Sequence, residues 1–148
     1  MSDWNYPEAI VGVFAINRKG ELLMVTTHKW PKMYAIPGGH IELGESVADT
    51  ARREMKEELN MRISFDRVIN VQEAIFPKGF YRKAHFLFVD VLCRALTEKV
   101  KIDNREIQSY RWIKPKAALK LRMNKYTRTA LRQLVDGNQK RWYHAEAK

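Results

Sequence analysis

Cysteine is nearly absent from this chain, which limits the chemistry that its fold can use. The 148 residues include one cysteine, Cys93, so no disulfide can form within the chain. Cys93 ends the apolar run 86–93 and has no obvious base near it in the sequence. We therefore expect a small buried core residue rather than a nucleophile.

Long hydrophobic runs are also missing. No apolar run approaches the ~20 residues of a membrane span, and residues 1–7 show no basic region followed by an apolar segment. We expect a soluble cytoplasmic protein with no membrane partner. The length fits a single domain over residues 1–148, and a hydrophobic content of 45% is enough to build a core.

Acidic residues are in short supply: 17 stand against 27 Lys and Arg, a formal net charge of +10. From Arg111 to Lys148 the acids are Asp136 and Glu146 alone. Such a surface attracts nucleotides, nucleic acids or anionic membranes, or is simply a solvated basic face. Direct nucleic-acid binding is not expected, because no recognition motif accompanies the charge.

Apolar periodicity and turn residues predict a mixed α/β (α+β) domain. The expected strands cover 9–16, 22–27, 34–36, 68–76, 84–95 and 110–113, and the expected helices cover 46–59, 115–121 and 126–135. Ser46 is the expected cap of the first helix. Asn60 follows that helix and tolerates the left-handed conformation of a helix end.

The first of these helices gathers negative charge. Glu54, Glu57 and Glu58 stand at positions i, i+3 and i+4, so they share one face and repel one another. Arg53 can pair with Glu57, but one arginine leaves net negative charge. A divalent cation would neutralise it, and carboxylate oxygens suit Mg²⁺ or Mn²⁺. The alternative is an acidic face that is only solvated.

The segment before the helix favours the metal site. Pro37-Gly38-Gly39 ends a short predicted strand with bare backbone, whose carbonyls and amides could face a metal ion or a phosphate. Glu42 and Glu45 follow in the loop that leads to the helix.

Residues 39–61 resemble the Nudix box: Gly, five residues, Glu, seven residues, then Arg-Glu-apolar-any-Glu-Glu-any-Gly-apolar. The matching residues are Gly39, Glu45, Arg53, Glu54, Met55, Glu57, Glu58 and Met61. Asn60 replaces the final glycine, a mild departure because Asn also enters left-handed turns. The resemblance implies a Nudix-type α/β/α sandwich, with a mixed sheet and a loop-helix-loop catalytic motif.

The resemblance also implies roles for these residues. Glu57 and Glu58 would be the main ligands of Mg²⁺ (or Mn²⁺), joined by the carbonyl of Gly38 or Gly39. Glu54 would bind metal or act as the general base, Arg53 would orient a glutamate, and Glu45 would support the loop.

Glu106 is a further candidate. In MutT-like members a glutamate often precedes a late tryptophan by six residues, and Glu106 stands six before Trp112. Resemblance therefore suggests a metal ligand or the base, with an ordinary loop acid as the alternative.

The implied reaction is Mg²⁺-dependent hydrolysis of a phosphoanhydride in a nucleoside diphosphate linked to another group. A nucleoside triphosphate, cut to the monophosphate and pyrophosphate, is favoured because His40 follows the glycines as in MutT-like enzymes. ADP-ribose and dinucleoside polyphosphates remain alternatives, as does a non-catalytic nucleotide- or RNA-binding regulator.

Several residues are candidates for substrate binding, and each has an ordinary structural alternative. Asn124 lies where some MutT-like enzymes place a base-reading amide, although it could simply cap the last helix. Tyr34 and Phe80 could stack on a base, and Lys78 and Arg82 could meet phosphates. The sequence leaves monomer and homodimer equally open.

Overall fold

The computed structural model describes residues 5–102, 105–137 and 143–144. The strands are β1 (Glu8–Ile16), β2 (Leu22–Thr27), β3 (Tyr34–Ala35), β4 (Gly38–His40), β5 (Ile63–Ile75), β6 (His85–Ala95), β7 (Ile107–Ile113) and β8 (Tyr143–His144). The helices are α1 (Val47–Leu59), α2 (Pro115–Ala118) and α3 (Lys125–Asp136). In the described part of the chain, no helix combines the length and apolar character that crossing a bilayer requires.

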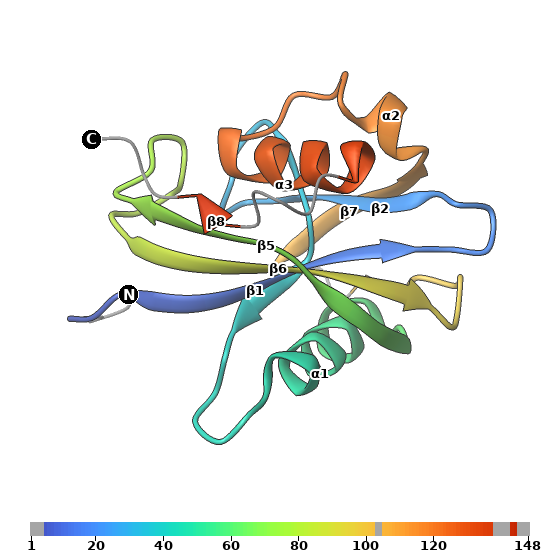
Figure 1. Ribbon diagram of the computed structural model, residues 1–148, viewed down its shortest axis with the longest axis horizontal. Helices are drawn as coiled ribbons and strands as arrows, with labels where there is room; N and C mark the ends of the chain where they lie inside the picture. The colour runs from blue at the N-terminus through green and yellow to red at the C-terminus, as the bar shows by residue number, and fades with distance from the viewer. Residues whose placement is uncertain (1–4, 103–104, 138–142, 145–148) are drawn as a thin grey trace.

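The strands form one mixed sheet in the order β3-β2-β1-β6-β5-β8, with β4 paired to β1 and β7 paired to β2. The β1–β6 and β5–β8 pairs are parallel and the other pairs are antiparallel. Helix α1 covers one face of the sheet, and α2 and α3 cover the other (Figure 1). This arrangement confirms the predicted mixed sheet between helices.

The two sheet faces separate the core into two layers because side chains alternate along each strand. On β1, Val11 and Val13 pack with Met55 and Leu59 of α1, whereas Phe14 packs with Ala130 and Leu131 of α3. The alternation therefore places α1 and α3 on opposite sides of β1.

Cys93 of β6 is fully buried in the layer beneath α1, which confirms the prediction of a core residue. Burial raises the pKa of its thiol to about 12. The side chain therefore stays a neutral thiol and contributes packing.

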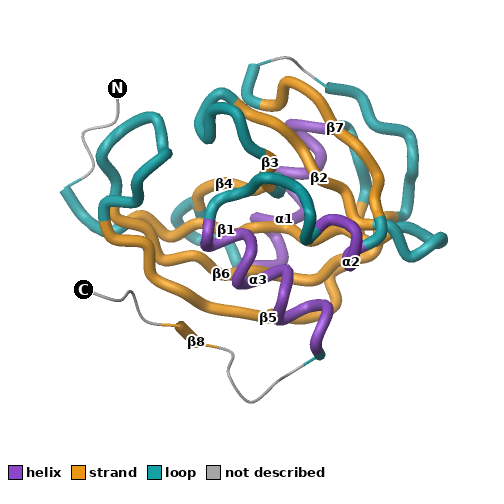
Figure 2. Tube along the Cα trace, turned by 90° about the horizontal axis from the view of Figure 1, so that it is seen from above, coloured by secondary structure: helices purple, strands orange, loops and turns teal. Residues whose placement is uncertain are grey.

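Strands β1 and β2 pair only at Ile16 and Leu22. Beyond that point β1 pairs with β4, while β2 pairs with β3 and β7. Figure 2 shows β2, β3 and β7 grouped on one side and β1, β5 and β6 on the other. The sheet therefore divides beside the Gly38-Gly39 segment, and Gly39 of that segment lies next to Glu54 of α1.

Several predicted boundaries need correction. Strand β5 begins at Ile63 rather than residue 68, because register shifts beside Asp66 break the alternation by which a strand is recognised. Strand β7 begins at Ile107 rather than residue 110, since its side chains from Gln108 to Arg111 are exposed and only backbone pairing with β2 reveals it.

Other corrections concern short elements. Helix α2 ends at Ala118 rather than residue 121, because Lys120 and Leu121 donate to carbonyls three residues back and tighten the turn. Strand β4 was not predicted, since glycines carry no strand signal, and β8 was also missed. Helix α3 matches its prediction to within one residue at each end.

Both ends of α1 follow the prediction. The Ser46 hydroxyl accepts a hydrogen bond from the Asp49 amide at 3.0 Å, which caps the first turn. Asn60 adopts the left-handed conformation with φ 53°, and its N–H donates to the carbonyl of Lys56. These caps fix the length of the helix and thus the positions of its glutamates.

We expect Asn60→Ala to lower the free energy of unfolding by about 1 kcal/mol, because Ala pays the full penalty of a left-handed backbone. Asn60→Gly should stay within about 0.5 kcal/mol of the native chain or exceed it. Urea denaturation of the three proteins measures both differences. An Ala variant as stable as the native chain would show that this backbone conformation carries no strain.

Candidate active site

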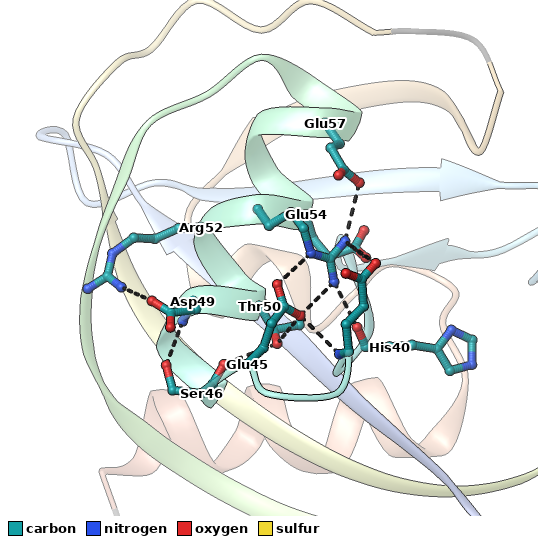
Figure 3. Close-up of polar contacts among 10 residues, drawn as sticks. His40, Glu45, Ser46, Asp49, Thr50, Arg52, Glu54 and Glu57 are labelled. Atoms are coloured by element: carbon teal, nitrogen blue, oxygen red, sulfur yellow. Dashed lines mark hydrogen bonds and ion pairs between the residues drawn. The ribbon is translucent and has the colours of Figure 1, made fainter.

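Arg53 reaches several of the acids around α1. Its Nε donates to Glu45 Oε2 at 2.7 Å, and its Nη2 donates to Glu45 Oε1 at 3.0 Å and to the His40 carbonyl at 2.9 Å. Its Nη1 donates to Glu54 at 2.9 Å and to Glu57 at 3.3 Å, so the expected Arg53–Glu57 pair forms. Figure 3 shows Glu45 and Glu57 turned toward the same guanidinium group.

Glu45 ties the loop before α1 to the helix. Besides Arg53, its Oε1 accepts hydrogen bonds from the Glu42 amide at 3.0 Å and from the Thr50 hydroxyl at 3.0 Å. The hydrogen bonds from Arg53 and then from the Glu42 amide lower the pKa of Glu45 to about 2. Glu45 is therefore ionised at neutral pH, and its contacts are those of a loop support.

Glu54, Glu58 and Glu106 form a second, more crowded group. The first two are only 8% and 5% exposed, and the carboxyl of Glu58 interacts with both of the others. Burial raises the pKa of Glu58 well above its usual range, and its hydrogen bonds with Glu106 and Glu54 raise it further. Burial also raises the pKa of Glu54, although hydrogen bonds with Glu58 and Arg53 oppose the change.

Glu106 is the ionised member of this group. The hydrogen bond from Glu58 and then that from Lys29 hold its pKa below the usual value, while burial opposes them. The Lys29 ammonium donates to Glu106 Oε1 at 2.8 Å. This contact places Lys29 in the site, and no sequence motif marks that residue.

Gly39 is required by the position of Glu54. A Cβ atom at residue 39 would lie 2.3 Å from Glu54 Oε1, so any side chain there would displace the carboxylate. Gly38 is equally confined, since its Cβ would lie 2.0 Å from the Val11 carbonyl oxygen. Gly39 thus brings bare backbone beside the Glu54 carboxyl.

The crowded group has the donor chemistry of a divalent-cation site. Hard cations such as Mg²⁺ and Mn²⁺ prefer oxygen ligands, and Glu54, Glu58 and Glu106 supply only oxygens beside the backbone of Gly39. Among the described residues, no three acidic, His or Cys side chains already form a complete ligand set. Glu57 lies apart from the group, with 56% of its side chain exposed.

A pocket of about 230 Å³ lies beside these acids. Its lining includes the acids Glu58 and Glu106. Lys29, Gly38, Gly39 and His40 also line it. An aromatic group consists of Phe86, Phe88 and Tyr126, with the polar residues Gln72, Asp90 and Asn124. One continuous pocket therefore joins crowded carboxylates to flat apolar walls.

The predicted substrate-binding residues divide between the pocket and the surface around it. Phe80, Arg82 and Asn124 line the pocket, whereas Lys78 and Tyr34 do not. Tyr34 packs instead against the core layer beneath α3. Asn124 caps α3, since its Oδ1 accepts from the Thr127 amide at 2.8 Å, and its role in base reading stays a prediction.

Arg82 is held by an acid that the sequence did not single out. Its Nη2 and Nη1 donate to the two carboxylate oxygens of buried Glu8 at 2.6 and 2.9 Å, and His40 Nε2 lies 2.7 Å from Glu8 Oε1. Burial opposes ionisation of Glu8, but the hydrogen bonds from Arg82 and His40 prevail and lower its pKa. Contact of Arg82 with phosphates would have to compete with this pair.

Asp90 of β6 carries a buried carboxylate that lines the same pocket as Glu58 and Glu106. Its Oδ2 accepts hydrogen bonds from Asn70 Nδ2 and Gln72 Nε2, both at 3.0 Å. Burial raises its pKa to about 6, although these hydrogen bonds act in the other direction. The signal for Asp90 was present in the sequence: it is the one charged residue within the apolar run 86–93.

The raised pKa of Asp90 predicts how stability depends on pH. The folded chain binds this proton more tightly than the unfolded chain does, so the free energy of unfolding falls as pH rises between about 4 and 6. Asp90→Asn removes this loss. The difference in melting temperature between Asp90→Asn and the native chain should therefore grow as pH rises from about 4 to 6 and stay constant above pH 6.

The matched control is Asp66→Asn, which alters an exposed aspartate paired with Arg67 at 3.0 Å. Its difference from the native chain should not change in the same way. A difference between Asp90→Asn and the native chain that is independent of pH would show that Asp90 has no raised pKa.

Comparisons with known proteins agree with this geometry. Nucleoside triphosphatase NudI of Escherichia coli strain K12 is 28% identical over 109 residues, which cover 70% of this chain and 77% of that protein. A MutT NUDIX hydrolase from Burkholderia pseudomallei superposes with a TM-score of 0.73 at 22% identity, over 88% of this chain and 99% of the other. An ADP-ribose pyrophosphatase from Streptococcus suis gives 0.65 at 17% identity, over 95% and 100%.

The two structural likenesses show a shared fold. The NUDIX domain family itself matches residues 7–134, a span that contains α1, the glycine pair, Glu106 and the pocket. The chain therefore belongs to the NUDIX domain family and is a Nudix hydrolase.

Proposed function

We propose that this Nudix hydrolase cleaves nucleoside triphosphates to the monophosphate and pyrophosphate, using Mg²⁺ or Mn²⁺. The observation that carries the proposal is the continuous pocket, which joins the carboxyls of Glu58 and Glu106 to the aromatic group. Its volume of about 230 Å³ is below the ~300–1,000 Å³ of typical ligand sites. The base would occupy the aromatic part, with the phosphates beside the acids.

The proposed metal ligands are Glu54, Glu57 and Glu58, with a carbonyl of Gly38 or Gly39 and with Glu106. A divalent ion bound there would screen the charge of the diphosphate and orient the attacking water. Crowding supports this assignment, because burial raises the pKa of both Glu58 and Glu54, and the neighbouring carboxyls raise that of Glu58 further. Glu57 would have to turn from Arg53 to join them.

The chain's own residues would perform the remaining steps. Arg53 holds Glu54 at 2.9 Å and so fixes the direction of its carboxylate toward Gly39. Either Glu54 or Glu106 would take the proton of the water, since an ionised carboxylate near the reacting water is a sufficient general base. Lys29 keeps Glu106 ionised and would make it the more available of the two.

ADP-ribose is the second candidate substrate. It contains the same diphosphate, and the fold is shared with an ADP-ribose pyrophosphatase from Streptococcus suis. The triphosphate is preferred because NudI, described as a nucleoside triphosphatase, is similar to this chain along 70% of its length. A regulator without catalysis is disfavoured, since every glutamate of the box is present.

A substrate panel tests the reaction. Nucleoside triphosphates, ADP-ribose and dinucleoside polyphosphates would each be incubated with Mg²⁺ or Mn²⁺, and the products separated by anion-exchange chromatography. Triphosphates should yield pyrophosphate and a monophosphate, and EDTA should abolish turnover until the metal is restored. Release of inorganic phosphate alone, or turnover only with ADP-ribose, would overturn the triphosphate assignment.

Glu58→Gln should lower kcat by about 100-fold or more, because it removes a negative ligand from the centre of the acidic group. Glu98→Gln is the control, since Glu98 lies on an exposed loop. Circular dichroism checks that both variants are folded. Native-like turnover by Glu58→Gln at saturating Mg²⁺ would remove this residue from the catalytic site.

A further inference from the structure

One carboxylate oxygen in the pocket has no hydrogen-bond partner within the part of the chain that the structure describes. Asp90 is only 5% exposed and lines the pocket, yet both of its hydrogen bonds, from Asn70 and Gln72, end on Oδ2. No hydrogen bond among the described residues ends on Oδ1. Buried carboxylate oxygens are normally satisfied, so Oδ1 is suited to accept a bond from a bound molecule.

The residues that hold Asp90 do so at a cost to stability. Asn70 is fully buried, and while its Nδ2 donates to Asp90, its own Oδ1 has no partner in residues 5–102, 105–137 and 143–144. A buried acceptor left in this way costs about 1–3 kcal/mol. Gln72 donates both to Asp90 and to the Tyr126 carbonyl at 2.8 Å, which links the carboxylate to the first turn of α3. These hydrogen bonds fix the direction of the Asp90 carboxylate. A core that served only for packing would not need a carboxylate held in this way.

Gly12 keeps the approach to this oxygen narrow but open. It pairs with Asp90 across β1 and β6, and a Cβ atom there would lie 2.9 Å from Asp90 Oδ1 and 2.8 Å from Ile36 Cδ1. Gly12 itself lines the pocket. Any side chain at this position would press on the free oxygen.

The surroundings of Oδ1 suit a flat heterocycle. Phe86 and Phe88 stack with ring centroids 5.0 Å apart, and Tyr126 lies 5.8 Å from Phe88. Asn124 lines the same pocket, and its side chain's only hydrogen bond to the described residues uses Oδ1, so its NH₂ group remains available as a donor. An acceptor, a donor and aromatic walls together match the edge and faces of a nucleobase.

We propose that Asp90 Oδ1 accepts a hydrogen bond from an N–H on the six-membered-ring edge of the substrate's nucleobase and thereby selects bases that carry such a donor. This rests on the proposed nucleotide hydrolysis and deepens it. The preferred substrates are nucleotides whose base offers a ring N–H or an amino group at that edge. Bases without one leave a buried carboxylate unpaired and are rejected.

The test compares each natural base with an analogue that lacks the donor: purine riboside triphosphate for the purines and 2-pyrimidinone riboside triphosphate for the pyrimidines. Wild-type kcat/KM should favour the best natural substrate over its analogue by about 10- to 100-fold, the worth of one hydrogen bond to a charged group. In Asp90→Asn the same ratio should fall to within about threefold, because the amide is a neutral and weaker partner.

Asp66→Asn is the matched control, because it makes the same chemical change at an exposed position of β5 and should keep the wild-type ratio. A purely structural role for Asp90 would lower kcat/KM for both members of a pair and leave their ratio unchanged. That result, in a folded Asp90→Asn protein, overturns the proposal.

The wild-type measurement decides the matter even if the variant does not fold. Wild-type hydrolysis that does not distinguish a base from its donor-free analogue overturns the role of Asp90 and leaves the proposed nucleotide hydrolysis standing. Failure to hydrolyse any nucleotide overturns both.

Discussion

Repulsion among buried carboxyls is the constraint on which the rest of the site depends. Glu54, Glu58 and Glu106 are brought together by α1 and by the segment before β7, while Arg53 is largely engaged by Glu45. The backbone of Gly39 closes the group without a side chain. The fold keeps these groups together although the raised pKa values of Glu54 and Glu58 indicate that ionising the whole group is unfavourable. A bound cation is the simplest compensation.

The division of the sheet places the acidic group beside a pocket. Because β1 leaves β2 after one residue pair and pairs with β4 instead, the Gly38-Gly39 backbone lines the same pocket as Asp90 of β6. The carboxyls of Glu58 and Glu106 and the residues proposed to contact the base, Asp90 and Asn124, therefore line one cavity. Under the proposed function, changes at Asp90 or Asn124 would alter which nucleotide binds without altering the acids of α1.

The sequence predicted those parts that local rules determine. Caps and periodicity located α1 and α3, and the spacing of Glu54, Glu57 and Glu58 identified the acidic helix. Contacts across the sheet could not be predicted in this way. The pairing of Lys29 with Glu106, of Arg82 with Glu8 and of Asn70 with Asp90 joins residues distant in sequence, and no spacing rule connects them. Glu57 and Glu58 also could not be told apart from sequence. Both share one helix face with Glu54, yet Glu57 is exposed and Glu58 is buried.

Binding of Mn²⁺ measured by electron paramagnetic resonance tests the central claim most directly, because it needs no substrate. The native chain should bind the ion, Mg²⁺ should displace it, and Glu58→Gln should weaken binding by about tenfold or more, as expected when a charged ligand is lost. Glu98→Gln should bind as the native chain does. A native chain that binds no Mn²⁺, or binds it equally well without the Glu58 carboxylate, would contradict the account.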